Sequence, residues 1–186
     1  GAMLAGLVGG VALVGFAALA RSRAQAAVPA DGHFVRVNGK RVHYRDEGSG
    51  PTIVMIHGLA GQMRNFSYAL LEKLANDHRV ILIDRPGSGY SDPIDSATVR
   101  SQAAHIGDAL QTLGLDRPLV VGHSLGGAVA LALALDRPEA VGGLALVAPL
   151  THPTDNVSEA FDGLAISSPA ARFAVAWTLA TPMMML

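Results

Sequence analysis

Residues 119–126 read LVVGHSLG, a branched apolar run followed directly by the pattern Gly-x-Ser-x-Gly. The pattern alone is weak, because a glycine-rich chain of this length would contain it by chance on the order of one time in ten. Its surroundings make it specific: a helical run from Leu125 to Leu135 follows and ends before Pro138. The order strand, sharp turn, helix exposes the hydroxyl of Ser124 and makes it a candidate nucleophile for an acyl carbonyl.

The glycines and the helix start have physical roles at such a turn. The turn forces Ser124 into a strained backbone conformation, and side chains two positions away on either side would collide with neighbouring backbone. We therefore expect that Gly122 and Gly126 are present because they lack side chains. The free N–H groups at the start of the helix favour negative charge on a reacting oxygen, so the N–H of Leu125 is a predicted oxyanion donor.

The rest of the chain predicts alternating strands and helices. Residues 34–37 and 41–44 alternate apolar and polar about Asn38-Gly39, which predicts a β-hairpin. Short, branched apolar runs predict further strands that are buried on both faces: 52–56, 80–83, 119–121 and 144–147. Apolar stripes at helical spacing lie between them: one over Phe66, Leu70 and Leu74, and one from Val99 to Leu113.

This alternation predicts an α/β fold: a mostly parallel sheet with right-handed crossovers and helices on both faces. Ligands bind such sheets beyond the carboxyl ends of the strands, so the residues that follow each strand are the candidates for function.

Two further blocks follow strands. Residues 56–61 read IHGLAG directly after the strand 52–56, and a second oxyanion donor is expected from such a loop. The N–H of Leu59 is the candidate. Residues 84–91 read DRPGSGYS, a glycine-rich turn that lacks the lysine and the helix context of a phosphate-binding loop.

The three blocks, in this order and spacing, resemble the α/β-hydrolase superfamily over residues 33–150. The resemblance implies a nucleophile at Ser124, in a nucleophile elbow with Gly122, His123 and Gly126. It implies oxyanion donors at Leu59 and Leu125, and a structural role for residues 84–91. A serine at this position is typical of the esterase, lipase and carbon–carbon hydrolase branches, whereas dehalogenases and epoxide hydrolases carry an aspartate.

Several other polar residues are interpreted as structural. We expect His57 and His123 to be packed residues that hold loops rather than a general base. We expect His105, on a helix far from the strand ends, to lie at the surface. Asp84 precedes the nucleophile, whereas the order in the family is serine, acid, histidine, so we interpret Asp84 as structural. Asp155 is a better candidate acid, but His152 is too early to be its base, and neither is assigned.

The chain departs from the family pattern at its end. In the family two more strands follow, the first leading to the acid and the second to the histidine, often with a lid before them. Residues 151–186 resemble the start of that lid, and the apolar stripe of Phe173, Trp177 and Ala180 suits either ordinary packing or the lining of an acyl pocket. We therefore expect an α/β-hydrolase fold truncated after the sixth strand, with the triad acid and histidine beyond Leu186.

Without a base, Ser124 would lose most of its rate, and the last strand would form an exposed apolar edge. We expect the chain to be part of a longer protein of roughly 300 residues, or to be completed by a second chain that carries the C-terminal half.

The N-terminal region predicts a membrane or export segment. Gly1-Ala2 is interpreted as a tag remnant, and residues 3–20 contain no charge and would span roughly 27 Å as a helix. A signal anchor, a cleaved signal peptide and a buried helix are the alternatives for residues 3–23. Arg21 and Arg23 follow the run, which favours an anchor with the hydrolase domain on the cytoplasmic side, although Ala24-Gln25-Ala26 also suits cleavage and export. Residues 24–32 are predicted to be a linker.

Composition excludes several classes of function. The formal net charge is −1 and the pI is about 6.7, so no basic surface for nucleic acid is expected. The absence of cysteine excludes disulfides, thiolate metal sites and a cysteine nucleophile. No cofactor and no metal are predicted.

The predicted function is a serine hydrolase that forms an acyl-enzyme with a small-molecule ester of a lipophilic acyl group. One alternative keeps the serine elbow for carbon–carbon bond hydrolysis or cofactor-free peroxy-acid formation. Another is a truncated pseudohydrolase that binds an apolar ligand or a partner without catalysis.

Overall fold

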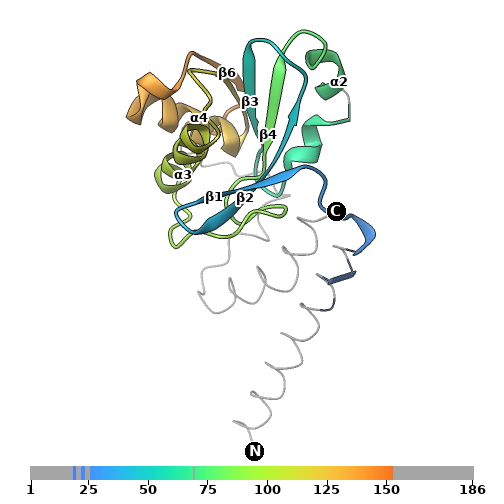
Figure 1. Ribbon diagram of the computed structural model, residues 1–186. Helices are drawn as coiled ribbons and strands as arrows, with labels where there is room; N and C mark the ends of the chain where they lie inside the picture. Colours follow the sequence, from blue (N-terminus) through green and yellow to red (C-terminus); the bar gives the residue numbers. More distant parts are fainter. Residues whose placement is uncertain (1–18, 20–21, 24–25, 69, 153–186) are drawn as a thin grey trace, which may run out of the picture. The chain divides into compact units, whose positions relative to one another are not determined.

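The computed structural model describes residues 19, 22–23, 26–68 and 70–152 (Figure 1). The chain divides into two compact units, and the fold below is that of residues 31–152. Most of the predicted anchor, Asp155 and the predicted lid stripe lie outside the described residues. Among the described residues, no helix is long and apolar enough to cross a membrane.

The core of the unit is a six-stranded, mostly parallel sheet in the order β1-β2-β4-β3-β5-β6. Its strands are β1 (His33–Val37), β2 (Lys40–Glu47), β3 (Thr52–Ile56), β4 (Arg79–Ile83), β5 (Leu119–His123) and β6 (Gly143–Val147). β2 pairs antiparallel with both β1 and β4, whereas β4, β3, β5 and β6 are parallel to one another. The predicted fold class is confirmed.

The register of the parallel strands brings their carboxyl ends together. Ile56 at the end of β3 pairs with Ile83 at the end of β4 and with Gly122 of β5. The loops that begin at residues 57, 84 and 124 therefore start side by side at one edge of the sheet.

The predicted hairpin turn is present between β1 and β2. Asn38 and Gly39 both have positive φ, 50° and 80°. This is the pattern of a type I′ turn, whose twist matches that of the two strands it joins.

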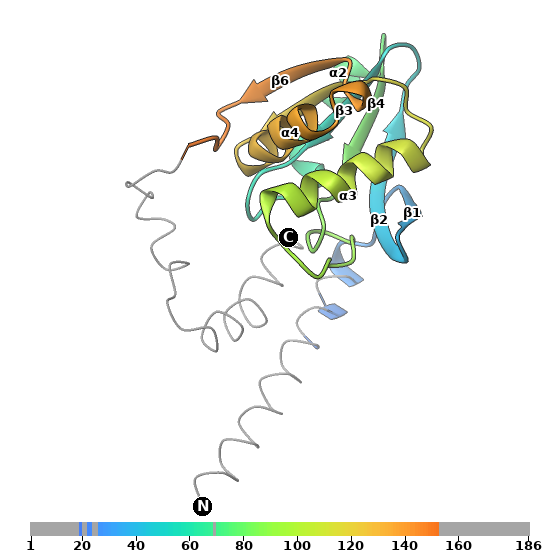
Figure 2. The ribbon, with the colours of Figure 1, turned by 90° about the vertical axis from the view of Figure 1, so that its left-hand side faces the viewer.

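Both faces of the sheet are covered. Val54, Ile81 and Val120 point to one face and pack with two long helices, α3 (Val99–Thr112) and α4 (Leu125–Asp136). These helices lie against each other on that face (Figure 2). Residues in alternate register, such as Ile53 and Val80, pack on the other face with Met63, Phe66 and Leu71. The alternation explains why these strands are apolar at every position.

The predicted helix through Phe66, Leu70 and Leu74 is wrong. The segment forms a 3-10 turn, η1 (Met63–Phe66), and a single α-helical turn, α2 (Leu71–Leu74), and Leu70 is 46% exposed. Ser67 ends the first turn, since its N–H and its hydroxyl both donate to the carbonyl of Arg64. A second 3-10 turn, η2 (Pro138–Ala140), follows α4.

β6 lies at the edge of the described sheet and pairs only with β5 among the described residues. Leu146 and Val147 near its end are 37% and 52% exposed. This matches the apolar edge predicted for the last strand.

Candidate active site

Ser124 lies at the turn between β5 and α4 in a strained backbone conformation. Its φ and ψ are 53° and −119°, and a positive φ is uncommon for a residue with a side chain. Its N–H donates to the carbonyl of Val147 at 3.0 Å, and its carbonyl accepts from the N–H groups of Gly127 and Leu150, both at 2.9 Å. These bonds fix the turn to β6 and to the loop that follows it.

The glycines around Ser124 allow the close approaches that the sequence predicts. A side chain at Gly122 would place its Cβ 2.5 Å from the carbonyl oxygen of Gly126. A side chain at Gly126 would collide with the carbonyl oxygens of Ile56 and His57. Gly127, which the sequence analysis did not single out, also allows a close approach. A Cβ added at Gly127 would lie 2.7 Å from Cβ of Pro149.

The loop after β3 lies against the serine. A Cβ at Gly58 would lie only 3.0 Å from Cβ of Ser124 and 3.2 Å from Nδ1 of His123. Leu59 follows directly, and Ala60 has a positive φ of 53°, so the loop turns sharply here. The structure thus brings together Ser124, the start of α4 at Leu125, and the loop that carries Leu59.

His57 holds this loop and has no nitrogen free for base catalysis. The imidazole is buried; its Nε2 accepts from the N–H of Arg85 at 3.0 Å, so the proton is on Nδ1, which donates to the carbonyl of Gly58 at 2.9 Å. Burial, followed by the charge of Arg85, lowers the pKa of His57 to about 4. The prediction that His57 is a packed, loop-holding residue is confirmed.

His123 and His105 differ from their predictions. His123 is exposed rather than packed. His105 is buried, since α3 packs against both α4 and β1 and so has more than one covered face. Burial lowers the pKa of His105.

Asp84 is structural, as predicted. It is fully buried, and its carboxylate accepts from the N–H of Met63 at 2.8 Å, from the N–H of Tyr90 at 3.1 Å, and from Nδ1 of His43 at 2.7 Å. The loop is closed by Ser91, whose hydroxyl donates to the Asp84 carbonyl and accepts from the His43 N–H. The sequence analysis did not identify His43.

No histidine is hydrogen-bonded to Ser124 in the part of the chain that the structure describes. Within residues 31–68 and 70–152, no hydrogen bond joins the Ser124 hydroxyl to an imidazole. His152 is exposed, and its Nδ1 lies 3.1 Å from the hydroxyl of Thr151. Among the described residues, Ser124 therefore lies in a strained turn between the start of α4 and the loop after β3, and its hydroxyl is hydrogen-bonded to no imidazole.

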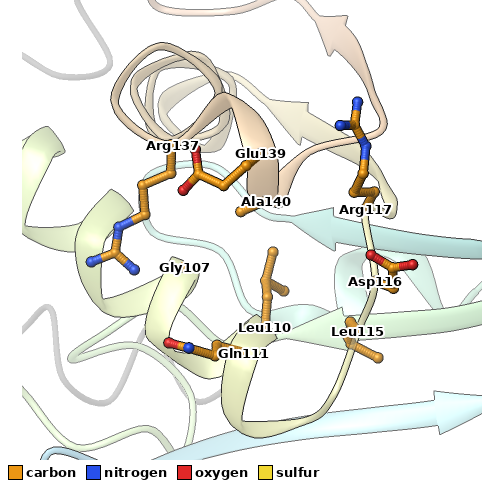
Figure 3. Close-up of a pocket in the computed structure, with 9 residues that line it drawn as sticks. All are labelled: Gly107, Leu110, Gln111, Leu115, Asp116, Arg117, Arg137, Glu139 and Ala140. Atoms are coloured by element: carbon orange, nitrogen blue, oxygen red, sulfur yellow. The ribbon is translucent and has the colours of Figure 1, made fainter.

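A cavity of about 230 Å³ lies elsewhere in the unit. It is lined by residues of α3, by the segment before β5 and by the segment after α4, among them Leu110, Arg117 and Arg137 (Figure 3). Residues 115–117 precede the amino end of β5, whereas Ser124 follows its carboxyl end. This cavity is therefore at the opposite end of the strand from Ser124.

Comparison with known proteins agrees with this fold. The model of the alpha/beta hydrolase fold family matches residues 51–174. A 2-hydroxy-6-oxononadienedioate/2-hydroxy-6-oxononatrienedioate hydrolase of Paraburkholderia phymatum is 45% identical over 114 residues, which are 58% of this chain and 39% of the relative. The dihydrolipoyllysine-residue acetyltransferase component of an acetoin cleaving system from Cupriavidus necator is 38% identical over 119 residues, 63% of this chain and 32% of the relative.

A solved structure has the same fold. The esterase from Exiguobacterium antarcticum shares 30% identity and a TM-score of 0.57 over 64% of this chain and 46% of its own. The chain spans less than half the length of each of these proteins.

Proposed function

The chain belongs to the α/β-hydrolase family, and we propose that it forms the nucleophile half of a serine hydrolase in which Ser124 is acylated by a small carbonyl substrate. The observation that carries this proposal is the strained turn at Ser124, which lies at the start of α4 and against the backbone of the loop after β3. A serine nucleophile needs an accessible hydroxyl and nearby backbone donors, and Ser124 is half-buried in this turn.

The proposed reaction has two steps. The Ser124 oxygen forms a bond to the carbonyl carbon while a base takes its proton, and the N–H groups of Leu59 and Leu125 stabilise the resulting oxyanion. The oxyanion collapses, the alcohol leaves with that proton, and water then hydrolyses the acyl-enzyme. The base and its acid are expected from residues outside the described region, in a longer protein or a second chain.

An ester of a lipophilic acid is the proposed substrate class. The named esterase among the structural neighbours supports ester cleavage. Carbon–carbon bond hydrolysis is the second candidate, because the relative at 45% identity is named as a hydrolase of 2-hydroxy-6-oxo dienedioates. In that reaction the same carbonyl chemistry expels a carbon leaving group instead of an alcohol.

The nucleophile is tested with a fluorophosphonate probe on the full-length protein. We expect labelling of the wild type and of Ser49→Ala, a matched control in an exposed loop, and no labelling of Ser124→Ala. Equal labelling of Ser124→Ala would show that another residue reacts. A folded wild type that is not labelled would support the pseudohydrolase alternative.

Substrate profiling then separates the chemistries. p-Nitrophenyl esters of increasing acyl length, a 2-hydroxy-6-oxo dienoate, and acetate with hydrogen peroxide are compared by kcat/KM. A preference for long acyl esters supports the first candidate. A preference for the dienoate supports carbon–carbon hydrolysis, and turnover only with peroxide supports peroxy-acid formation.

A further inference from the structure

Arg85 is a buried arginine beside the candidate site. Only 3% of its surface is exposed, and no carboxylate is hydrogen-bonded to it among the described residues. Burial lowers its pKa to about 10, so it stays charged at neutral pH. Burying a cation is costly unless its donors are satisfied, so the groups that accept from it indicate what it does.

The Arg85 guanidinium holds two consecutive carbonyls of the loop after β3. Its Nε donates to the carbonyl of His57 at 2.9 Å, and one Nη donates to the carbonyl of Gly58 at 2.7 Å. The planar fork of a guanidinium suits such a double contact, whereas the single ammonium of lysine does not.

The other Nη fixes the guanidinium to α3. It donates to Oε1 of Gln102 at 2.6 Å, and Nε2 of Gln102 donates in turn to the carbonyl of Ala97 at 2.9 Å. Gln102 is buried as well. The orientation of Arg85 is therefore set by a helix, and all three of its nitrogens donate.

Holding the Gly58 carbonyl also sets the direction of the next N–H. The Gly58–Leu59 peptide bond is trans, so the Leu59 N–H points opposite to the Gly58 carbonyl. Since that carbonyl points toward the buried guanidinium, the Leu59 N–H points away from the guanidinium. The Cα of Gly58, at the same peptide, lies close to Ser124, because a Cβ added there would be 3.0 Å from Cβ of Ser124. A charged donor on the carbonyl also polarises the peptide group and strengthens its N–H as a donor.

We propose that Arg85 is a positioning residue of the oxyanion hole, which aims the Leu59 N–H by holding the Gly58 carbonyl. The inference rests on the proposed function, because it requires an oxyanion formed at Ser124. His57 supports the same carbonyl through Nδ1, and the Gly61 N–H donates to it at 3.3 Å, so that Gly58 O accepts three hydrogen bonds.

The test uses Arg85→Met and Arg85→Lys in the full-length protein, with Arg79→Met as a control. Arg79 pairs with Asp46 and begins β4, opposite Thr52 at the start of β3, whereas the loop after β3 begins at the other end of that strand. For each variant, kcat and KM are measured with a p-nitrophenyl ester, and the inhibition constant is measured with an alkyl boronic acid, which forms a tetrahedral adduct with a serine oxygen. Thermal unfolding reports whether each variant is folded.

We expect kcat of Arg85→Met to fall roughly 10- to 100-fold while KM changes less than about threefold, because loss of one oxyanion donor acts on the transition state. The inhibition constant should rise in parallel with the loss of kcat. Arg85→Lys should show a smaller loss, and Arg79→Met should behave as wild type in kcat. If Arg85 had only a structural role, Arg85→Met would lower the melting temperature without a selective fall in kcat relative to KM.

The inference is wrong if folded Arg85→Met keeps kcat and boronic acid affinity within about twofold of wild type. If Arg85→Met does not fold, the same criterion applies to Arg85→Lys. Ser124→Ala distinguishes failure of the proposed function from failure of the inference about Arg85. Full turnover in Ser124→Ala overturns both. An inactive Ser124→Ala beside a fully active Arg85→Met overturns the inference alone.

Discussion

At the residue scale, His57 is a neutral imidazole that is hydrogen-bonded to two backbone groups, the N–H of Arg85 and the carbonyl of Gly58. An N–H of Arg85 can only donate and a carbonyl of Gly58 can only accept, so the tautomer of His57 is set by its partners. Protonation of Nε2 would remove the bond from Arg85 and place a second charge beside the guanidinium. The loop next to Ser124 therefore depends on an uncharged His57.

This dependence predicts that the protein loses stability at acidic pH. The pKa of His57 is about 4 in the folded protein and about 6.5 in an unfolded chain. Between these values only the unfolded state binds the proton, so the free energy of unfolding is highest above pH 6.5 and falls as the pH decreases toward 4. The expected contribution is at most roughly 3 kcal/mol.

The measurement compares urea unfolding of wild type and His57→Gln at several pH values from 4 to 7. The variant should have a shallower pH dependence, because it lacks the group that takes up the proton on unfolding. His33→Gln, at an exposed position in β1, serves as the control and should keep the wild-type slope. Equal slopes for wild type and His57→Gln would contradict the prediction.

At the element scale, α4 approaches the end of β3 more closely than a helix with side chains would allow. Gly126, in the first turn of α4, lies over the carbonyls of Ile56 and His57, and Gly122 of β5 lies under the same turn. The helix start and the loop after β3 therefore form one packed unit beside Ser124.

Gly126→Ala is expected to destabilise the protein by roughly 2–3 kcal/mol, because the added methyl group collides with backbone that cannot move without shifting β3. It should also lower kcat, since any shift moves Leu59 relative to Ser124. Thermal and urea unfolding measure the first effect, and ester hydrolysis measures the second.

The matched control is Gly143→Ala in β6, where the added Cβ would meet only Cδ1 of the flexible Leu119 side chain at 3.1 Å. We expect a much smaller change there. Similar losses of stability in Gly126→Ala and Gly143→Ala would contradict the prediction that the close contact between α4 and β3 is the cause.

At the scale of the whole molecule, the fold was predictable because its strands are short, branched apolar runs, α3 has an apolar stripe, and α4 is a continuous apolar run that follows a sharp turn. The structure of residues 63–74 was not predictable from their helical spacing. Two hydrogen bonds override that spacing: the Ser67 hydroxyl donates to the carbonyl of Arg64, and the Met63 N–H donates to the Asp84 carboxylate. The contact of His43 with Asp84 depends on the pairing of β2 with β4, in which Tyr44 lies opposite Ile83. Nothing in the local sequence specifies this register.

The packing around Ser124 was predictable only in part. The roles of Gly122 and Gly126 follow from local geometry, whereas the hold of Arg85 on the Gly58 carbonyl joins two loops through tertiary structure. Such a contact cannot be inferred from spacing along the chain. The catalytic roles of Ser124, Leu59 and Leu125 remain predictions for the experiments above.

The remaining prediction concerns attachment of the whole protein to a membrane. Residues 3–20 form an uncharged apolar run of about one bilayer core in length, and Arg21 and Arg23 follow it. If this run is an anchor, the full-length protein should sediment with membranes and resist extraction by carbonate, and deletion of residues 3–23 should release it. Intact-mass analysis of the mature protein distinguishes the alternatives: an N-terminus at Met3 agrees with an anchor, and one near Ala27 agrees with a cleaved signal peptide. An uncleaved protein found entirely in the soluble fraction would contradict both, and would favour packing of the run within the protein, where it would cover apolar surface in place of lipid.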